Sequence, residues 1–326
     1  MKALALISGG LDSSLAAYLV KIQGIEVIGI NFRTPFCCCE AAKHGGCAAK
    51  DAVKFLKISL RMLPIGEEML GIVKNPRFGY GQGLNPCIDC KIMMWEKAKK
   101  LMEEEGAKFL VSGEVVGQRP MSQRRRIIEL IEKESGLEGK IVRPLSAKLL
   151  PPSLPEKEGW VRREDFLKIE GRSRKVQMAL AQEIGLTHYP SPAGGCLLTD
   201  PGFSRRMKDL IEHKGDFSLK DIEVLKIGRH FRLDSGIKAI VGRNEEENKK
   251  LEFLLQGKEC TLQVKGGKGA LVVLEGECSE KDISDGASLA AFYSAHRQDK
   301  EVEVTWKNGE SEGLVRVEPG KRGRML

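Results

Sequence analysis

The segment from Leu4 to Val20, at the start of the 326-residue chain, most strongly limits what this sequence can form. Its apolar beginning, from Ala3 to Ile7, is typical of a strand that is buried on both faces. Gly9 and Gly10 follow and let consecutive N–H groups point into one concavity, and apolar residues then recur with helical spacing. Because the positive end of a helix dipole would lie behind the concavity, the segment predicts a phosphate site. The simpler alternative is an ordinary glycine turn between strand and helix.

The string Ser-Gly-Gly-Leu-Asp-Ser-Ser resembles the pyrophosphate loop of the PP-loop ATPases. It is not a Walker loop, because no Gly-Lys-Ser/Thr follows it. The resemblance implies ATP and Mg²⁺ as cofactors and the adenylation of a carbonyl oxygen. It implies that the phosphates are bound by Ser8, Gly9, Gly10, Asp12, Ser13 and Ser14, with Asp12 near the metal. It also implies that a second strand, over 27–31, ends at Phe32, where this family holds the adenine.

Short apolar runs alternate with helical patterns over the first 115 or so residues. Strands are predicted at 4–7, 27–30 and 109–112, a helix over 92–105, an extended proline-rich connection over 144–155 and a further helix within 171–185. Strand–helix alternation with a phosphate loop after the first strand predicts an α/β fold with a doubly wound parallel sheet. The resemblance makes this sheet one of the PP-loop (adenine nucleotide alpha hydrolase-like) type.

The sequence pattern changes at Phe217. After it, short strands are predicted at 261–264, 270–274, 301–306 and 313–317, around one helix near 284–294. We therefore expect two domains, a catalytic domain over 1–216 and an α+β domain over 217–326. The segments 241–248, 287–295 and 317–321 resemble the RNA-binding domain of the NFACT proteins. That family's aspartate-tryptophan-histidine region is absent and 260–264 stands in its place, so we expect a different RNA surface. Because residues 217–326 carry no net charge, a structural cap is the alternative to RNA binding.

Composition predicts the cellular location of the protein, the state of its cysteines and the class of its partner. Because the chain has no run of eighteen apolar residues and begins directly in a strand, we expect no membrane span, no signal peptide and a cytoplasmic location. Nine cysteines favour reduced thiols, metal binding or catalysis over a disulfide framework. The net charge is +8, and residues 117–175 hold 15 Lys and Arg against 9 Asp and Glu, whereas 217–326 hold 19 of each. A basic segment beside an ATP site suggests RNA as partner, with a solvated charged face as the alternative.

Cys87 and Cys90 form a C-x-x-C pair at the start of the helix predicted from Ile92, and this spacing lets two thiolates point at one centre. The helix dipole and Lys91 are expected to lower the pKa values of both thiols. The third candidate is Cys196, because the two glycines before it let the backbone approach a cluster closely. The C-x-x-C pair by itself leaves zinc, redox chemistry and chance open.

Three further motifs, Ser112 to Gln118, Ser122-Gln123 and Val142 to Leu145, resemble those of the PP-loop tRNA thiolases, which replace a base oxygen by sulfur. The resemblance adds Gly113 and Gln118 to the cofactor-binding residues. One type in that family uses a persulfide cysteine and a resolving cysteine, and the other binds a [4Fe-4S] cluster through three cysteines. Cys87, Cys90 and Cys196 fit the second type. A structural zinc ion normally takes four protein ligands, which makes zinc the less favoured metal.

The resemblance thus implies an ATP-dependent tRNA sulfurtransferase in which Asp12 and the three cysteines are catalytic. Mg-ATP would adenylate the oxygen of an unstacked base, and sulfide delivered from the open iron would displace AMP. The sulfur donor would be free sulfide or a sulfur carrier. One alternative is an RNA-associated PP-loop protein without thiolation activity. The other is a PP-loop enzyme that adenylates a different substrate and holds zinc at the cysteines.

Two groups of residues extend this hypothesis. A track for tRNA phosphates beside the ATP pocket is predicted from the cations that follow the Ser112 to Gln118 motif and the proline-rich connection, namely Arg124, Arg125, Arg126, Arg162, Arg163, Arg172, Arg174 and Lys175. Four more cysteines follow the second strand, namely Cys37, Cys38, Cys39 and Cys47. They are interpreted as ligands of another metal, as a sulfur relay or as small buried residues. We expect the C-terminal domain to take the place of the RNA-binding domain that precedes the loop in many thiouridine synthetases, and the sequence does not indicate an oligomeric state.

Overall fold

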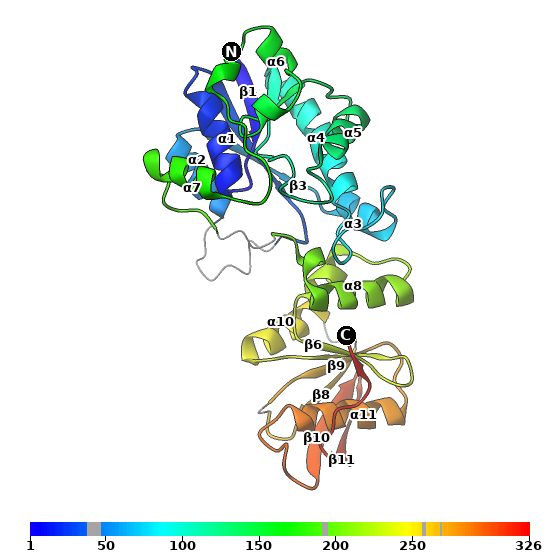
Figure 1. Cartoon of the computed structure of the whole chain (residues 1–326). Coiled ribbons are helices and arrows are strands. Elements are labelled where there is room, and N and C mark those ends of the chain that lie inside the picture. Colours follow the sequence, from blue (N-terminus) through cyan, green and yellow to red (C-terminus); the bar gives the residue numbers. More distant parts are fainter. Residues whose placement is uncertain (38–46, 191–194, 256–258, 268) are drawn as a thin grey trace. The chain divides into compact units, whose positions relative to one another are not determined.

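The computed structural model describes residues 1–37, 47–190, 195–255, 259–267 and 269–326 (Figure 1). These residues form two compact units, Met1–Thr199 and Asp200–Leu326. The sequence placed the boundary after residue 216, where the composition changes. In the structure α8 (Pro201–His213) belongs to the second unit, because its buried Asp209 accepts a hydrogen bond of 3.0 Å from Arg232 on the sheet of that unit.

The described part of the first unit contains one parallel sheet in the order β3-β2-β1-β4-β5. The strands are β1 (Lys2–Leu6), β2 (Glu26–Arg33), β3 (Ser59–Pro64), β4 (Phe109–Val111) and β5 (Ile141–Val142). This order confirms the predicted doubly wound sheet. The chain runs outward from β1 through β2 to β3 and then returns to the other side of β1 at β4. The switch point between β1 and β4 is where such sheets bind ligands, at the carboxyl ends of the strands.

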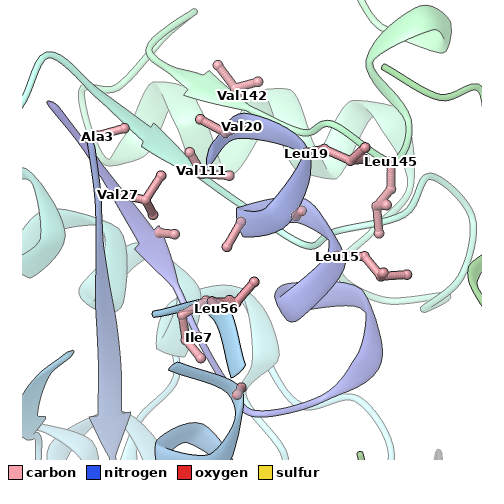
Figure 2. Packing of buried hydrophobic residues seen from close by; sticks show 14 of the residues in the cluster. Ala3, Ile7, Leu15, Leu19, Val20, Val27, Leu56, Val111, Val142 and Leu145 are labelled. Atoms are coloured by element: carbon pink, nitrogen blue, oxygen red, sulfur yellow. The ribbon is translucent and has the colours of Figure 1, made fainter. Parts of the chain in front are cut away.

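Both faces of this sheet are covered by helices, as the continuous apolar sequence of β1 predicts. Ala3, Ala5 and Ile7 point to a core shared with α1 (Leu11–Lys21), α2 (Ala48–Leu56) and α7 (Lys175–Glu183), part of which is shown in Figure 2. Leu4, which lies between them, points to the opposite core. That core contains residues of α4 (Cys87–Glu104) and α5 (Arg125–Glu134).

The remaining elements in the described part of the first unit are short. They are α3 (Glu67–Lys74), α6 (Leu154–Lys157) and three 3-10 helices at Ala147–Leu149, Arg163–Asp165 and Leu197–Thr199. Helix α6 begins at the last two residues of the connection predicted to be extended and continues beyond it. It forms because Ser153 and Glu156 make a reciprocal capping box around Pro155. Helix α4 begins at Cys87, earlier than predicted, with Pro86 as its N-cap residue, so both cysteines of the C-x-x-C pair lie inside the helix.

The described residues of the second unit form an antiparallel sheet in the order β11-β10-β8-β9-β7-β6-β12, which confirms the α+β prediction. The strands are β6 (Arg229–Arg232), β7 (Lys238–Val241), β8 (Cys260–Val264), β9 (Val272–Glu275), β10 (Val302–Asn308), β11 (Ser311–Val317) and β12 (Arg324–Met325). Helices α9 (Leu219–Leu225) and α10 (Glu245–Leu255) precede α11 (Glu280–Phe292), which packs on the sheet through Leu289 and Ala290. Within the described segments, no helix has the length and hydropathy needed to cross a bilayer.

Candidate functional site

Hydrogen bonds among its own residues hold the loop between β1 and α1 together. The hydroxyls of Ser13 and Ser14 each donate to the carbonyl of Gly10 at 3.0 Å, and the Ser8 and Ser13 hydroxyl oxygens are 3.1 Å apart. Gly10 is the N-cap residue of α1, and no side chain caps the helix there. The first N–H groups of α1 therefore have no capping side chain and can donate hydrogen bonds to an anion.

Two glycines let the backbone pack closely around this loop. Gly9 has a φ of +80°, and a Cβ atom on it would lie 2.2 Å from the backbone carbon of Ala48 at the start of α2. A Cβ atom on Gly113, which follows β4, would lie 2.5 Å from the backbone nitrogen of Ser13. The loop is therefore held between the N-termini of α1 and α2, directly at the switch point of the sheet.

Asp12 has the one feature in this loop that fits a metal ion. Its Oδ2 accepts a hydrogen bond from Nε2 of Gln118 at 3.1 Å, whereas its buried Oδ1 has no hydrogen-bond partner among the described residues. A buried carboxylate oxygen without a donor is costly unless a cation binds it. Mg²⁺ prefers oxygen ligands and is commonly held by one or two carboxylates together with phosphates, so Asp12 fits the ion that accompanies ATP.

Glu114 is the centre of a buried charged network that connects three elements. Its carboxylate is paired with Lys91 of α4 and accepts a hydrogen bond of 2.9 Å from Nε of Arg143, which is also paired with Glu132 of α5. Glu114 is 7% exposed and Arg143 is 4% exposed. Burial alone would raise the pKa of Glu114, but the charges of Lys91 and Arg143 outweigh burial and lower it to about 2.

The substitution Glu114→Gln is expected to destabilise the protein by about 3 to 5 kcal/mol, because it leaves buried cations without their carboxylate. The pKa of Glu114 is below its ordinary value of 4.5 in the folded protein, so its contribution is complete above that value and is lost as the pH falls toward 2. The free energy of unfolding of the parent should therefore fall more steeply than that of the variant between pH 5 and pH 2. Urea titrations across this range test the prediction.

The control for Glu114 is Glu68→Gln, which breaks an exposed pair with Lys97 on the same helix α4. We expect this control to cost less than about 1 kcal/mol. Equal losses in the two variants, or parallel pH curves for Glu114→Gln and the parent, would contradict the assignment of Glu114 as the centre of the network.

Several other buried polar atoms around this region have no hydrogen-bond partner within the part of the chain that the structure describes. They are Ser122 Oγ, Gln123 Oε1, Arg143 Nη2, Arg174 Nε and both amide atoms of Gln177, whose side chain is 0% exposed. The segment before α7 is hydrogen-bonded to the stretch that contains Gln118. The Gly171 N–H donates to the carbonyl of Val116, two residues before Gln118, at 2.8 Å. Gln177 was missed by the sequence analysis. Its only signal is its position one turn after Arg174 on the same helix face.

The three predicted cysteine ligands lie at the carboxyl edge of the same sheet. Cys87 and Cys90 occupy the first turn of α4, and Cys196 lies on a segment whose Leu198 carbonyl accepts a hydrogen bond of 3.1 Å from Leu84 N–H, just before that helix. All three thiols are half-buried. Burial, followed by the charges of Cys196 and Cys87, raises the pKa of Cys90 to about 12. The structure therefore brings Cys196 and the C-x-x-C pair into electrostatic contact.

The expected lowering of the Cys90 pKa is wrong for the metal-free protein. Lys91 does act in the predicted direction, but it is paired with Glu114 and is outweighed by burial and by the neighbouring thiols. Among the described residues, no three His, Cys, Asp or Glu side chains are placed to hold a single metal ion. The preference for a four-iron cluster over zinc at these thiols stays a prediction.

Comparison with protein families finds a match for each of two segments of the chain. Residues 1–148 match the family described as thiamine biosynthesis protein (ThiI). Residues 228–325 match the NFACT protein RNA binding domain. Residues 1–148 are called the ThiI-type region below and residues 228–325 the NFACT-type domain, after the families that they resemble.

The ThiI-type region also has curated relatives. It is 31% identical over 127 residues to a probable tRNA sulfurtransferase of Methanothermobacter thermautotrophicus, covering 36% of this chain and 30% of that protein. It is 33% identical over 118 residues to a tRNA-specific 2-thiouridylase, MnmA, of Clostridium acetobutylicum, covering 32% and 33%. The chain thus spans about a third of the length of these relatives. A solved complex of a 4-thiouridine synthetase with RNA and ATP is 20% identical, with a TM-score of 0.40 over 69% of this chain and 52% of that one.

Phe32 and the four cysteines that follow the second strand are the other predicted positions of the ThiI-type region. Strand β2 continues to Arg33, so Phe32 lies inside the strand and packs partly against the α4 core, because its side chain shares the face of Ile28 and Ile30. A role of Phe32 in holding adenine stays a prediction. Cys47 is the N-cap residue of α2, Cys37 is half-buried, and Cys38 and Cys39 lie outside the described residues.

The predicted RNA-binding cations lie in two segments, one within the ThiI-type region and one after it. Arg124, the N-cap residue of α5, follows Gln123, whose carbonyl accepts a hydrogen bond of 2.8 Å from Gly117 N–H. Arg125, Arg126, Arg172 and Lys175 are exposed, whereas Arg174 is half-buried. Both basic segments are therefore attached to the stretch that contacts Asp12. Their function as an RNA track stays a prediction.

Proposed function

We propose that this protein is an ATP-dependent tRNA sulfurtransferase, which adenylates a base oxygen and replaces it by sulfur. The observation that carries the proposal is the direct connection between the phosphate loop and the thiols. Gly113 packs against Ser13 of the loop, the adjacent Glu114 is paired with Lys91, and Lys91 follows Cys90 in the chain. An ATP site and a sulfur site that share one buried network suit a reaction with an adenylated intermediate and a sulfur nucleophile.

The proposed roles of the chain's residues follow from their positions. The N–H groups at the start of α1 bind the phosphates of ATP, and Asp12 Oδ1 binds Mg²⁺, so charge on the departing pyrophosphate is stabilised by preorganised groups. Gln118 holds the other oxygen of Asp12 in place. Cys87, Cys90 and Cys196 would hold a [4Fe-4S] cluster, which supplies an iron with an open position for sulfide. Glu114 and Lys91 keep α4, and with it the thiols, next to the loop.

The choice of tRNA as substrate is supported by charge in the ThiI-type region and by aromatic side chains in the NFACT-type domain. In that domain the guanidinium of Arg297 lies 4.3 Å from the ring centre of Phe292, and that of Arg229 lies 4.8 Å from Tyr293. Lys321 Nζ lies 5.4 Å from the ring of Phe292. Cations over aromatic rings at a half-buried surface suit unpaired bases and the phosphates beside them.

Replacing Arg124, Arg125 and Arg126 by Ala should weaken tRNA binding and leave ATP binding unchanged. Each phosphate contact contributes about 0.9 to the slope of log affinity against log salt for a duplex, so the slope should flatten by roughly 2 to 3. The measurement is a filter-binding or anisotropy titration at several salt concentrations. The matched control replaces Lys54, Lys57 and Lys108, which lie at the amino-terminal edge of the sheet, opposite the site. A slope that changes equally in both triple variants would reject the arginine track.

The proposed function is tested by incubating protein reconstituted without oxygen with unmodified tRNA, Mg-ATP and sulfide. We expect pyrophosphate release and, after digestion of the tRNA, one nucleoside whose mass has increased by the difference between sulfur and oxygen. Pyrophosphate release with another carbonyl compound and none with tRNA would identify a different adenylating enzyme. ATP and RNA binding without pyrophosphate release would identify a binding protein. Either result overturns the proposal.

A further inference from the structure

Cys37 lies directly across a strand pair from Cys196. The two residues form an isolated antiparallel bridge, and Leu197 N–H donates to the Phe36 carbonyl at 2.9 Å. Because the bond joins the residue after Cys196 to the residue before Cys37, the cysteines themselves are a non-hydrogen-bonded pair. In such a pair the Cα atoms are about 4.5 Å apart and the side chains lie on the same side of the ladder.

This spacing is within the range that disulfide bonds require, about 4.4 to 6.8 Å between Cα atoms. The flanking residues hold the bridge in place, because Phe36 and Leu198 are both 0% exposed and the Leu198 carbonyl is bonded to Leu84. The two cysteines themselves are half-buried, so a small reagent in solvent can reach them. The spacing, the buried flanking residues and the partial exposure of this pair are therefore all compatible with a disulfide bond.

We propose that Cys37 and Cys196 form a disulfide by exchange with a low-molecular-weight disulfide, RSSR. The thiolate of Cys37 attacks RSSR, which forms a mixed disulfide with Cys37 and releases RS⁻. The thiolate of Cys196 then attacks the Cys37 sulfur, forms the Cys37–Cys196 bond and releases the second RS⁻. Two cysteine thiols are oxidised and one RSSR is reduced to two thiols, which take up the two cysteine protons.

This modification changes the ligand set of the sulfur site. A disulfide at Cys196 leaves only Cys87 and Cys90 to bind a metal cluster, and two thiolates hold an iron–sulfur cluster less well than three. The chain thereby gains a reversible oxidised form in which the third ligand is covalently protected by Cys37. The consequence for iron rests on the proposed function, whereas the disulfide itself does not.

The test uses full-length apo-protein that has been stripped of metal, reduced, desalted and then treated with oxidised glutathione. Alkylation in acid and digestion with trypsin place Cys37 in the peptide 34–43, Cys196 in 176–205 and the C-x-x-C pair in 78–91. We expect the 34–43 and 176–205 peptides to be recovered as one linked species in the parent and in Cys38→Ser. The link should be lost in both Cys37→Ser and Cys37→Ala. Both variants should keep the thermal unfolding midpoint of the parent.

Three results would overturn the proposal. They are a linked species that survives in Cys37→Ser, a link from 176–205 to 78–91 while Cys37 is fully alkylated, or no link to 176–205 at all in the parent. A second readout is iron uptake on reconstitution, which should be reduced at least several-fold by prior oxidation in the parent and not in Cys37→Ser. Peptide mapping needs no ATP, tRNA or iron, so a failed thiolation assay leaves this result intact and the two failures are distinguishable.

Discussion

Asp12→Ala is expected to reduce tRNA-dependent pyrophosphate release at least about 100-fold, because it removes the carboxylate that would hold Mg²⁺ against the phosphates. The fold should change little. Asp12 Oδ1 has no hydrogen-bond partner among the residues that the structure describes, and the bond from Gln118 to Oδ2 is worth about 1 kcal/mol. The measurement is enzyme-coupled pyrophosphate release under saturating ATP, together with the free energy of unfolding of each variant.

Two further variants separate metal binding from charge and shape at this position. Asp12→Asn keeps the size of the side chain and a partner for Gln118 but loses the negative charge, so it should be nearly as inactive as Asp12→Ala. Asp234→Ala removes an exposed carboxylate from the second unit and should match the parent. Undiminished pyrophosphate release in Asp12→Asn would show that this carboxylate does not bind the catalytic metal.

Substitution of any one of the three cysteines should abolish the iron–sulfur cluster. On the three-thiolate hypothesis, protein prepared without oxygen is brown and holds about four irons per chain. Cys87→Ala, Cys90→Ala and Cys196→Ala should each lose most of the iron, the visible absorption and the thionucleoside product, because two protein thiolates do not retain such a cluster. Iron analysis and the absorption spectrum of each purified variant provide the measurement.

The matched controls are Cys47→Ala and Cys278→Ala, which remove half-buried thiols outside the predicted ligand set. Both should keep the colour and the iron of the parent. A colourless protein that takes up zinc and no iron in the absence of oxygen would reject the cluster, and full iron content in Cys196→Ala would reject the third ligand. Because Cys196→Ala also removes one half of the proposed disulfide, Cys37→Ala is the variant that distinguishes the two roles.

Local sequence alone determined the ligand loop and the class of the fold. The apolar run before Ser8, the two glycines and the helical spacing after Ser13 involve contacts between near neighbours in the chain, so their structure follows from backbone geometry and the burial pattern. Alternating strands and helices likewise predict a parallel sheet, since parallel neighbours need a crossover between them. The start of α4 was misplaced because helix ends depend on capping contacts that the sequence signals weakly.

Contacts between distant segments were decided only by the tertiary structure. Glu114 appeared in the sequence as part of a motif, whereas its pairing with Lys91 and Arg143, and hence its pKa of about 2, depends on packing that brings three separate parts of the chain together. For the same reason the pKa of Cys90 moved opposite to the expectation from its own helix. The sequence also named Cys37 and Cys196 in separate motifs. Only the ladder at residues 36–37 and 196–197 places their side chains on one side, because strand register is set by packing on both sides of the pair.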